Sequence, residues 1–203
     1  MSNKKAVVLL SGGADSVAVY HKLKDEGYEC SGLFFEYGQP NQEVERFLVE
    51  QTAQKFGEQF WVQKVDFLKQ MRGEVQTDAQ AFVPHRNTIF MLLAANHAES
   101  IGYENIAIGY MKQDIAFFDN SIRHHELIQT IVQSNIKHDF NVLLPLANMM
   151  KSDVMKYLKE KNAQSVSCWT AKIVDDKIVI CGKCANCRER ELAELEAEGK
   201  APF

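Results

Sequence analysis

A run of five apolar residues, Ala6–Leu10, stands directly before the turn Ser11-Gly12-Gly13. The run has no polar alternation, which is typical of a strand buried on both faces of a parallel sheet. Residues 14–26 follow with apolar side chains at helical spacing and end at Gly27, a residue suited to terminating a helix. The segment therefore predicts a βα unit within a sheet that helices cover on both faces.

The rest of the chain repeats this alternation, so we expect a doubly wound, mainly parallel α/β sheet. In the helices, Phe47, Leu127 and Ile131 are expected to face the core, and residues 66–84 are expected to form a long loop beside the site. Further strands are predicted at residues 29–36, 59–65, 105–109 and 142–144, and further helices at 41–56, 87–101, 122–137 and 151–161.

The chain has 203 residues, of which 46% are hydrophobic, enough for one core and a small appendage. We expect one domain over residues 1–165 and a distinct C-terminal segment over 166–203. A net charge of −4 supplies no basic field for nucleic acid or anionic membranes. No apolar run, including 89–95, approaches the roughly 20 residues of a membrane helix, so a soluble cytoplasmic protein is expected.

The turn between the first strand and its helix has the composition of a phosphate site. Paired glycines let the backbone approach an anion, and the N-terminal end of the helix attracts negative charge. Asp15 would repel phosphate unless Mg²⁺ lies between them, so a bridging metal is predicted. The alternative is a glycine-rich turn in which Asp15 and Ser16 simply cap the helix.

Four cysteines near the C-terminus have the spacing of a zinc site: Cys168, Cys181, Cys184 and Cys187. A predicted hairpin over 172–180 separates the first two, and a helix is expected over 188–198. Four thiolates close a tetrahedral site, so the ion would be structural. Reduced structural cysteines, or a redox dithiol of Cys184 and Cys187, remain alternatives, and Cys30 is interpreted as a core thiol.

The phosphate loop resembles the SGGxDS loop of the N-type ATP pyrophosphatases, which cleave ATP between its α and β phosphates. It differs from the GxxxxGK[ST] and GxGxxG loops of other nucleotide-binding folds. Together with residues 34–39, residues 83–88 and the cysteines, it makes the chain similar to the family of 7-cyano-7-deazaguanine synthases. That resemblance implies an adenine nucleotide alpha hydrolase-like fold and a homodimeric ligase that converts 7-carboxy-7-deazaguanine and ammonia into the nitrile precursor of queuosine.

The resemblance also implies roles for individual residues. Asp15, Ser16, Arg86 and Lys151 would be catalytic, with Lys151 neutralising pyrophosphate. Arg86, Asn87 and Asp119 would contact the 7-deazapurine, and the carboxylate of Asp119 would accept from its N1–H and 2-amino groups; the alternative for Asp119 is a loop cap. ATP and Mg²⁺ would be bound by the segment Leu10, Ser11, Gly12, Gly13, Ala14, Asp15, Ser16 and Val17, with backbone groups at Leu33 and Phe34 facing adenine.

Two features depart from the family pattern. His85 occupies a position where the family usually has a small residue, and residues 113–121 match its substrate loop only loosely. These departures leave open a paralogue that activates a related deazapurine and passes it to another acceptor. A tRNA sulfurtransferase and a zinc-ribbon binding module with a vestigial loop are further alternatives. His124 and His125 are interpreted as surface histidines, because neighbours on a helix face different ways.

Overall fold

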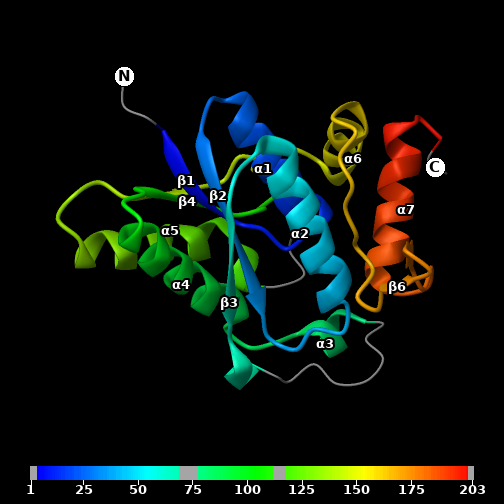
Figure 1. Cartoon of the computed structure of the whole chain (residues 1–203), viewed down its shortest axis with the longest axis horizontal. Coiled ribbons are helices and arrows are strands. Elements are labelled where there is room, and N and C mark those ends of the chain that lie inside the picture. Colours follow the sequence, from blue (N-terminus) through cyan, green and yellow to red (C-terminus); the bar gives the residue numbers. More distant parts are fainter. Residues whose placement is uncertain (1–3, 69–76, 112–117, 201–203) are drawn as a thin grey trace.

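The computed structural model describes residues 4–68, 77–111 and 118–200, in which the larger sheet is parallel and has the strand order β3-β2-β1-β4-β5 (Figure 1). Its strands are β1 (Lys5–Leu9), β2 (Glu29–Glu36), β3 (Phe60–Lys64), β4 (Asn105–Ala107) and β5 (Asn141–Leu143). From the central β1, the chain builds first toward β3 and then toward β5. The predicted doubly wound α/β fold is confirmed, and the order reverses between β1 and β4, where such folds bind ligands.

Helices cover both faces of the sheet, as the unbroken apolar run of β1 requires. Ala6 and Val8 belong to one core cluster with α1 (Ala14–Asp25) and α6 (Lys151–Glu160). Val7 points to the opposite face, into a cluster with α4 (Arg86–Ser100) and α5 (Ile122–Asn135). Figure 1 shows α4 and α5 together, away from α6.

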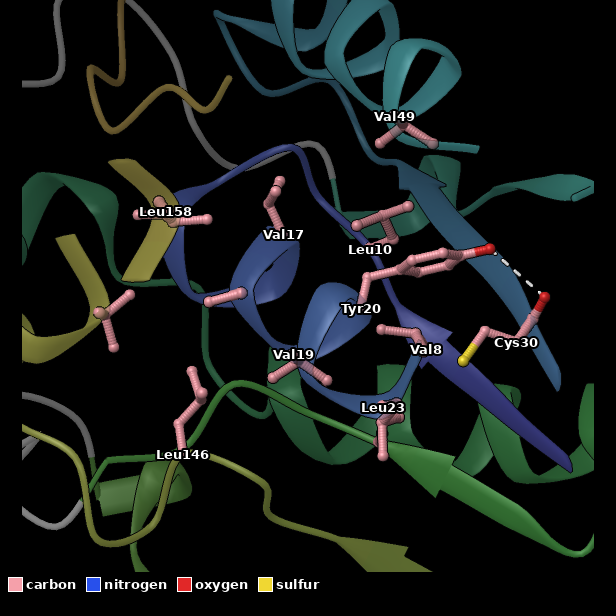
Figure 2. Packing of buried hydrophobic residues seen from close by; sticks show 14 of the residues in the cluster. Val8, Leu10, Val17, Val19, Tyr20, Leu23, Cys30, Val49, Leu146 and Leu158 are labelled. Atoms are coloured by element: carbon pink, nitrogen blue, oxygen red, sulfur yellow. Dashed lines mark hydrogen bonds between the residues drawn. The ribbon is translucent and has the colours of Figure 1, made fainter. Parts of the chain in front are cut away.

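Helix α1 supplies much of the core on its side of the sheet (Figure 2). Tyr20 is fully buried there, and its hydroxyl donates to the carboxylate of Glu58 at 2.6 Å and to the carbonyl of Cys30 at 3.3 Å. Burial raises the pKa of the Cys30 thiol to about 12. The interpretation of Cys30 as a core thiol is therefore confirmed.

Three apolar residues expected to face the core are partly exposed instead. In α5, Leu127 is 53% exposed and Ile131 is also exposed, while Ile128 and Val132 are buried. The apolar residues of this helix allow two overlapping stripes, and packing against α4 and β5 selects one of them. Phe47 of α2 (Gln42–Phe56) lies partly exposed beside that helix's buried face.

The prediction of two surface histidines is wrong for His125, which is buried. Its Nδ1 lies 2.7 Å from the carbonyl oxygen of Ser121, and its ring packs 5.0 Å from that of Tyr110. His124 is partly buried, and its Nε2 lies 2.8 Å from Oγ1 of Thr88 on α4. The two rings thus serve the packing of α5 against its neighbours.

The C-terminal segment forms a hairpin of β6 (Lys172–Val174) and β7 (Lys177–Val179), followed by α7 (Ala185–Ala197). Helix α7 starts three residues earlier than expected, so Cys184 is its N-cap and Cys187 lies in its first turn. The segment shares a buried cluster with α2, made of Val44, Leu48, Val166, Cys168, Ala171, Cys184 and Cys187. The C-terminal segment is therefore packed against α2.

A four-residue helix, α3 (Asp78–Ala81), interrupts the expected loop over 66–84, because Thr77 and Gln80 form a reciprocal capping box. Residues 69–76 of that loop lie outside the described part of the chain. No helix in the described ranges is both long and apolar enough to cross a bilayer.

The buried His21 predicts a pH-dependent stability. Burial, and then the nearby Lys55 and Lys161, lower its pKa from 6.5 to about 4. Between those values the unfolded chain binds the extra proton, so stability falls as the pH falls. Chemical denaturation at pH 7 and pH 5 should show that the wild-type chain loses about 1 to 2 kcal/mol more than the His21→Leu variant. Equal losses in the two proteins would contradict the assignment.

Candidate active site

A cavity of about 460 Å³ opens at the carboxyl ends of β1, β2 and β4. It lies at the reversal of strand order, where doubly wound sheets bind their ligands. Most of the site residues predicted from the sequence line it: Leu10, Ser11, Gly13, Ala14, Asp15, Ser16, Leu33, Phe34, Arg86, Asn87 and Lys151. Residues far apart in the chain are thus brought to one cavity.

The hydroxyl of Ser16 holds the phosphate loop in shape. Its Oγ accepts from the backbone N–H of Ser11 at 3.1 Å and donates to the carbonyl of Gly13 at 3.0 Å. Gly13 is the N-cap of α1 and offers no side-chain cap. The alternative in which Asp15 and Ser16 cap the helix is therefore wrong, and the positive end of α1 faces the cavity.

Val17 is not among the residues that line the cavity, and neither is Gly12, which packs against α2. Its φ of +72° lies in the left-handed region, and a Cβ on it would meet the carbonyl oxygen of Glu45 at 2.8 Å. Its own carbonyl accepts from the backbone N–H of Val166 at 3.0 Å. Only glycine fits this position without displacing α2.

Asp15 and Lys151 form an ion pair inside the cavity. The Nζ of Lys151 lies 2.8 Å from both carboxylate oxygens of Asp15, and the two side chains are 12% and 29% exposed, respectively. Gly109 closes the other side, since a Cβ there would lie 2.8 Å from the Cβ of Asp15. One carboxylate beside serine oxygens suits Mg²⁺, which binds few protein ligands and takes others from phosphate.

Arg86 stands at the start of α4 against an aromatic wall. Its Nη1 donates to the hydroxyl of Tyr37 at 3.2 Å, and burial raises the pKa of that hydroxyl. Behind Tyr37, the rings of Phe35 and Phe90 stack with centroids 4.1 Å apart. His85 is the N-cap of this helix and has a φ of +59°, in the left-handed region that favours glycine and that histidine adopts more often than most other residues.

Asp119 acts on α4 rather than facing the cavity. Its carboxylate accepts from the backbone N–H of Asn87 at 3.3 Å and from the Asn87 side chain at 3.4 Å. It therefore caps the helix that carries Arg86, and it positions an amide that does line the cavity. Residues 113–117 of the loosely matched loop lie outside the described part of the chain.

The sequence reasoning missed a polar cluster formed by Gln39, Asn41 and Glu45, all of which line the cavity. The Glu45 carboxylate accepts from the Gln39 side chain at 2.9 Å and from the Asn41 side chain at 3.0 Å. Burial raises the pKa of Glu45 to about 7, against the opposing effect of these two amides and of Arg86. The position of Gln39 after β2 was an available signal, whereas Glu45 reads as an ordinary helix surface charge.

The sulfur atoms of the four cysteines converge, with their Sγ atoms all within 4.8 Å of one another. Those of Cys181 and Cys187 are 4.0 Å apart, close to the spacing of about 3.8 Å that tetrahedral zinc–thiolate bonds of about 2.3 Å imply. Hydrogen bonds reach two of the sulfurs from the backbone N–H groups of Cys181 and Cys184. The cluster can therefore hold a metal ion, and its donor set suits zinc.

The cysteine segment also builds part of the cavity. The side chain of Asn41 donates to the carbonyl of Cys168 at 3.1 Å. Ser167 and Trp169, on either side of that cysteine, line the cavity together with Asn186 of α7. A metal ion bound by the four cysteines would therefore fix one wall of the site.

A parallel α/β sheet whose central strand ends in this phosphate loop defines the class of PP-loop proteins. A solved structure shares the fold: the U34-tRNA thiolase NcsA from Methanococcus maripaludis aligns with a TM-score of 0.59 and 14% sequence identity, over 97% of this chain and 66% of that one. The model of the queuosine biosynthesis protein QueC matches residues 5–198. The chain belongs to the QueC family.

Curated relatives extend over nearly the whole chain. A 7-cyano-7-deazaguanine synthase from Stutzerimonas stutzeri is 31% identical, covering 97% of this chain and 96% of the relative. Another from Oceanobacillus iheyensis is 32% identical, covering 100% of this chain and 99% of the relative. The chain is therefore an enzyme of the family, and the resemblance inferred from its motifs is confirmed.

Removing one cysteine should disturb both the metal site and the cavity. We expect Cys184→Ser to lose bound zinc and about 3 kcal/mol of stability, or roughly 10 °C in Tm, since three thiolates leave the site incomplete. Nucleotide affinity should fall with it, because the same segment lines the cavity. Zinc content and thermal unfolding measure this outcome. The control is Cys30→Ala, which removes a buried thiol outside the cluster. If Cys184→Ser kept one zinc ion per chain and normal stability, the prediction would be contradicted.

Proposed function

We propose that this enzyme is an ATP-dependent carbon–nitrogen ligase that converts 7-carboxy-7-deazaguanine and ammonia into 7-cyano-7-deazaguanine. The observation that carries the proposal is the shared cavity, in which a pyrophosphate loop, Arg86 and Lys151 meet in a chain of the QueC family. A carboxylate and a triphosphate are both anionic, so they can react only where cations and helix N-termini compensate their charge.

The phosphate loop would bind ATP through the first turn of α1 and the hydroxyls of Ser11 and Ser16. Asp15 would hold Mg²⁺, which supplies charge neutralisation on the phosphates when bound. Lys151 is then released from its ion pair with Asp15 and can contact the departing pyrophosphate. Adenine would lie against the backbone at Leu33 and Phe34, which line the cavity from the C-terminal half of β2.

Arg86 and Asn87 would orient the substrate carboxylate toward the α-phosphorus of ATP. Attack there gives an acyl adenylate and pyrophosphate, and ammonia then displaces AMP to give the amide. A second ATP activates the amide oxygen, and loss of AMP gives the nitrile. We propose that Asp119 contributes by fixing Asn87, through the two hydrogen bonds it accepts from that residue.

We further propose that the four cysteines hold a structural zinc ion and that the enzyme works as a cytoplasmic homodimer on small molecules. A closed set of four thiolates leaves no coordination position for substrate. The net charge of −4 gives no general attraction to nucleic acid. The homodimer follows from the family resemblance alone.

A second candidate is a paralogue that activates a related deazapurine and transfers it to another acceptor. It is favoured by His85, whose side chain stands at an exposed helix start beside the cavity residues Arg86 and Asn87. Incubation with ATP, ammonium and 7-carboxy-7-deazaguanine, followed by mass spectrometry, separates the two. The nitrile supports the first candidate, and an activated but unaminated deazapurine supports the second.

The bond cleaved in ATP can be tested directly. We expect AMP and pyrophosphate, because the loop lacks the Lys-Ser/Thr ending with which kinase-type loops reach the terminal phosphates. With ¹⁸O in the substrate carboxylate, label should appear in AMP, since the carboxyl oxygen bridges carbon and phosphorus before ammonia displaces it. Accumulation of ADP, with label in inorganic phosphate, would mean that the wrong bond has been assigned.

Asp15→Asn should lower the rate of ATP–pyrophosphate exchange at least 100-fold, which is roughly the effect of removing one group that stabilises charge in a transition state. Its Tm should change little, because Asp15 faces the cavity and is not part of the core. The matched control is Glu26→Gln, an exposed carboxylate that follows the same helix. Near-normal exchange by Asp15→Asn would remove the proposed metal role.

A further inference from the structure

The carboxylate of Glu45 faces the cavity and is held by two neutral amides. Its two oxygens accept from the side chains of Gln39 and Asn41, which are 4% and 5% exposed. Each amide is fixed in turn: Gln39 also donates to the carbonyl of Phe35 at 2.9 Å, and Asn41 to that of Cys168. Because a backbone carbonyl also holds each amide, the two amides keep the Glu45 carboxylate in one position.

The position of Glu45 relates it to the reacting groups. Its backbone carbonyl is the atom that leaves no room for a Cβ on Gly12, so Glu45 lies directly behind the pyrophosphate loop. Its side chain lines the same cavity as Arg86 and the Asp15–Lys151 pair. Glu45 therefore lines the cavity in which the acyl adenylate would form.

The other carboxylates near the cavity are already engaged or exposed. Asp15 pairs with Lys151, Asp119 caps α4, and Glu189 of α7 is exposed at the cavity wall. Among the described residues, no lysine or arginine forms an ion pair with Glu45. It can therefore take up a proton without breaking a salt bridge.

We propose that Glu45 is the general base that takes a proton from ammonium as its nitrogen attacks the acyl adenylate. This inference rests on the proposed ammonia-using reaction. It assigns Glu45 a catalytic role in the amination step and none in the adenylation step.

Ammonium gives one proton to ionised Glu45, which becomes neutral, and the freed lone pair forms the C–N bond to the carbonyl carbon. The C–O bond to AMP breaks, and AMP leaves with that electron pair. The attacking nitrogen then loses a second proton to water, which leaves the neutral amide.

The charged surroundings of Glu45 set the pH range of the step. Burial opposes the ionised form, whereas the hydrogen bonds from Gln39 and Asn41 and the charge of Arg86 on α4 favour it. Burial raises the pKa of Tyr37 above its ordinary value of 10, so its hydroxyl is neutral near pH 7. The Asp15–Lys151 pair and Glu189 line the same cavity. With a pKa of about 7, Glu45 becomes able to accept a proton as the pH rises through 7.

The test compares Glu45→Gln with wild type in two half-reactions of the intact chain. With ammonium as the nucleophile, kcat/KM for amide formation should fall about 100-fold, a typical contribution of a general base. With hydroxylamine, which is unprotonated at neutral pH, the variant should keep a rate within about threefold of wild type. ATP–pyrophosphate exchange should also be within about threefold, because adenylation does not need this base.

Two further variants complete the design. Glu45→Asp keeps a base and should recover part of the ammonium rate. Glu43→Gln removes an exposed charge from the same turn of α2 and should behave as wild type. The ratio of the wild-type rate to the Glu45→Gln rate with ammonium should rise through pH 7.

The outcomes separate the two claims. A normal rate with ammonium in Glu45→Gln would overturn the base role. Equal losses of rate with ammonium and hydroxylamine, or the loss of ATP–pyrophosphate exchange in the variant, would also overturn it, because either result indicates a structural role. In each of these cases the wild-type enzyme still catalyses ATP–pyrophosphate exchange with 7-carboxy-7-deazaguanine, so the proposed function is not affected. Absence of exchange in the wild-type enzyme would overturn the proposed function itself, and this inference with it.

Discussion

The close contact between the backbone of Gly12 and helix α2 is the constraint on which the site depends. A Cβ on Gly12 would lie 2.8 Å from the carbonyl oxygen of Glu45, so only glycine lets the phosphate loop at the end of β1 approach α2 this closely. On its other side, Gly12 accepts from the backbone of Val166, which leads into the cysteine segment. The loop is thus held between the sheet domain and the C-terminal segment.

This arrangement explains how a chain of net charge −4 can build a site for anions. The positive end of α1, Lys151 and Arg86 converge on one cavity, whereas two of the carboxylates there, those of Asp15 and Glu45, are held by an ion pair and by hydrogen bonds, respectively. Asp15 is balanced by Lys151, and Glu45 by two fixed amides and the field of Arg86. Local placement, rather than overall charge, gives the site its electrostatic character.

The cysteine cluster has a structural part in the same site. It shares a buried cluster with Val44 and Leu48 of α2, the helix that carries Glu45. Asn41 joins the two systems, because its side chain contacts both the Glu45 carboxylate and the carbonyl of Cys168. A metal ion there would therefore stabilise the cavity without taking part in its chemistry.

The predictions that succeeded rest on local patterns. The apolar run of β1, the glycine turn and the cysteine spacing each have few structural solutions, so the parallel sheet, the phosphate loop and the convergence of the four sulfurs were predicted from the sequence. The failures came where two solutions were locally equivalent. Two apolar stripes were available in α5, and only packing against α4 and β5 buried His125 and exposed Leu127.

By itself, the sequence determined the doubly wound fold, the phosphate loop and the cysteine cluster, because each is marked by a local pattern: strands alternating with helices, the turn at residues 11–16, and the spacing of the cysteines. The tertiary structure alone decided the partners of the long-range charges: Lys151 with Asp15, Asp119 with Asn87, and Glu45 within its cage of amides. The physical reason is that a carboxylate's role depends on which donors and how much water surround it, and neighbouring strands and helices bring those donors from distant parts of the chain.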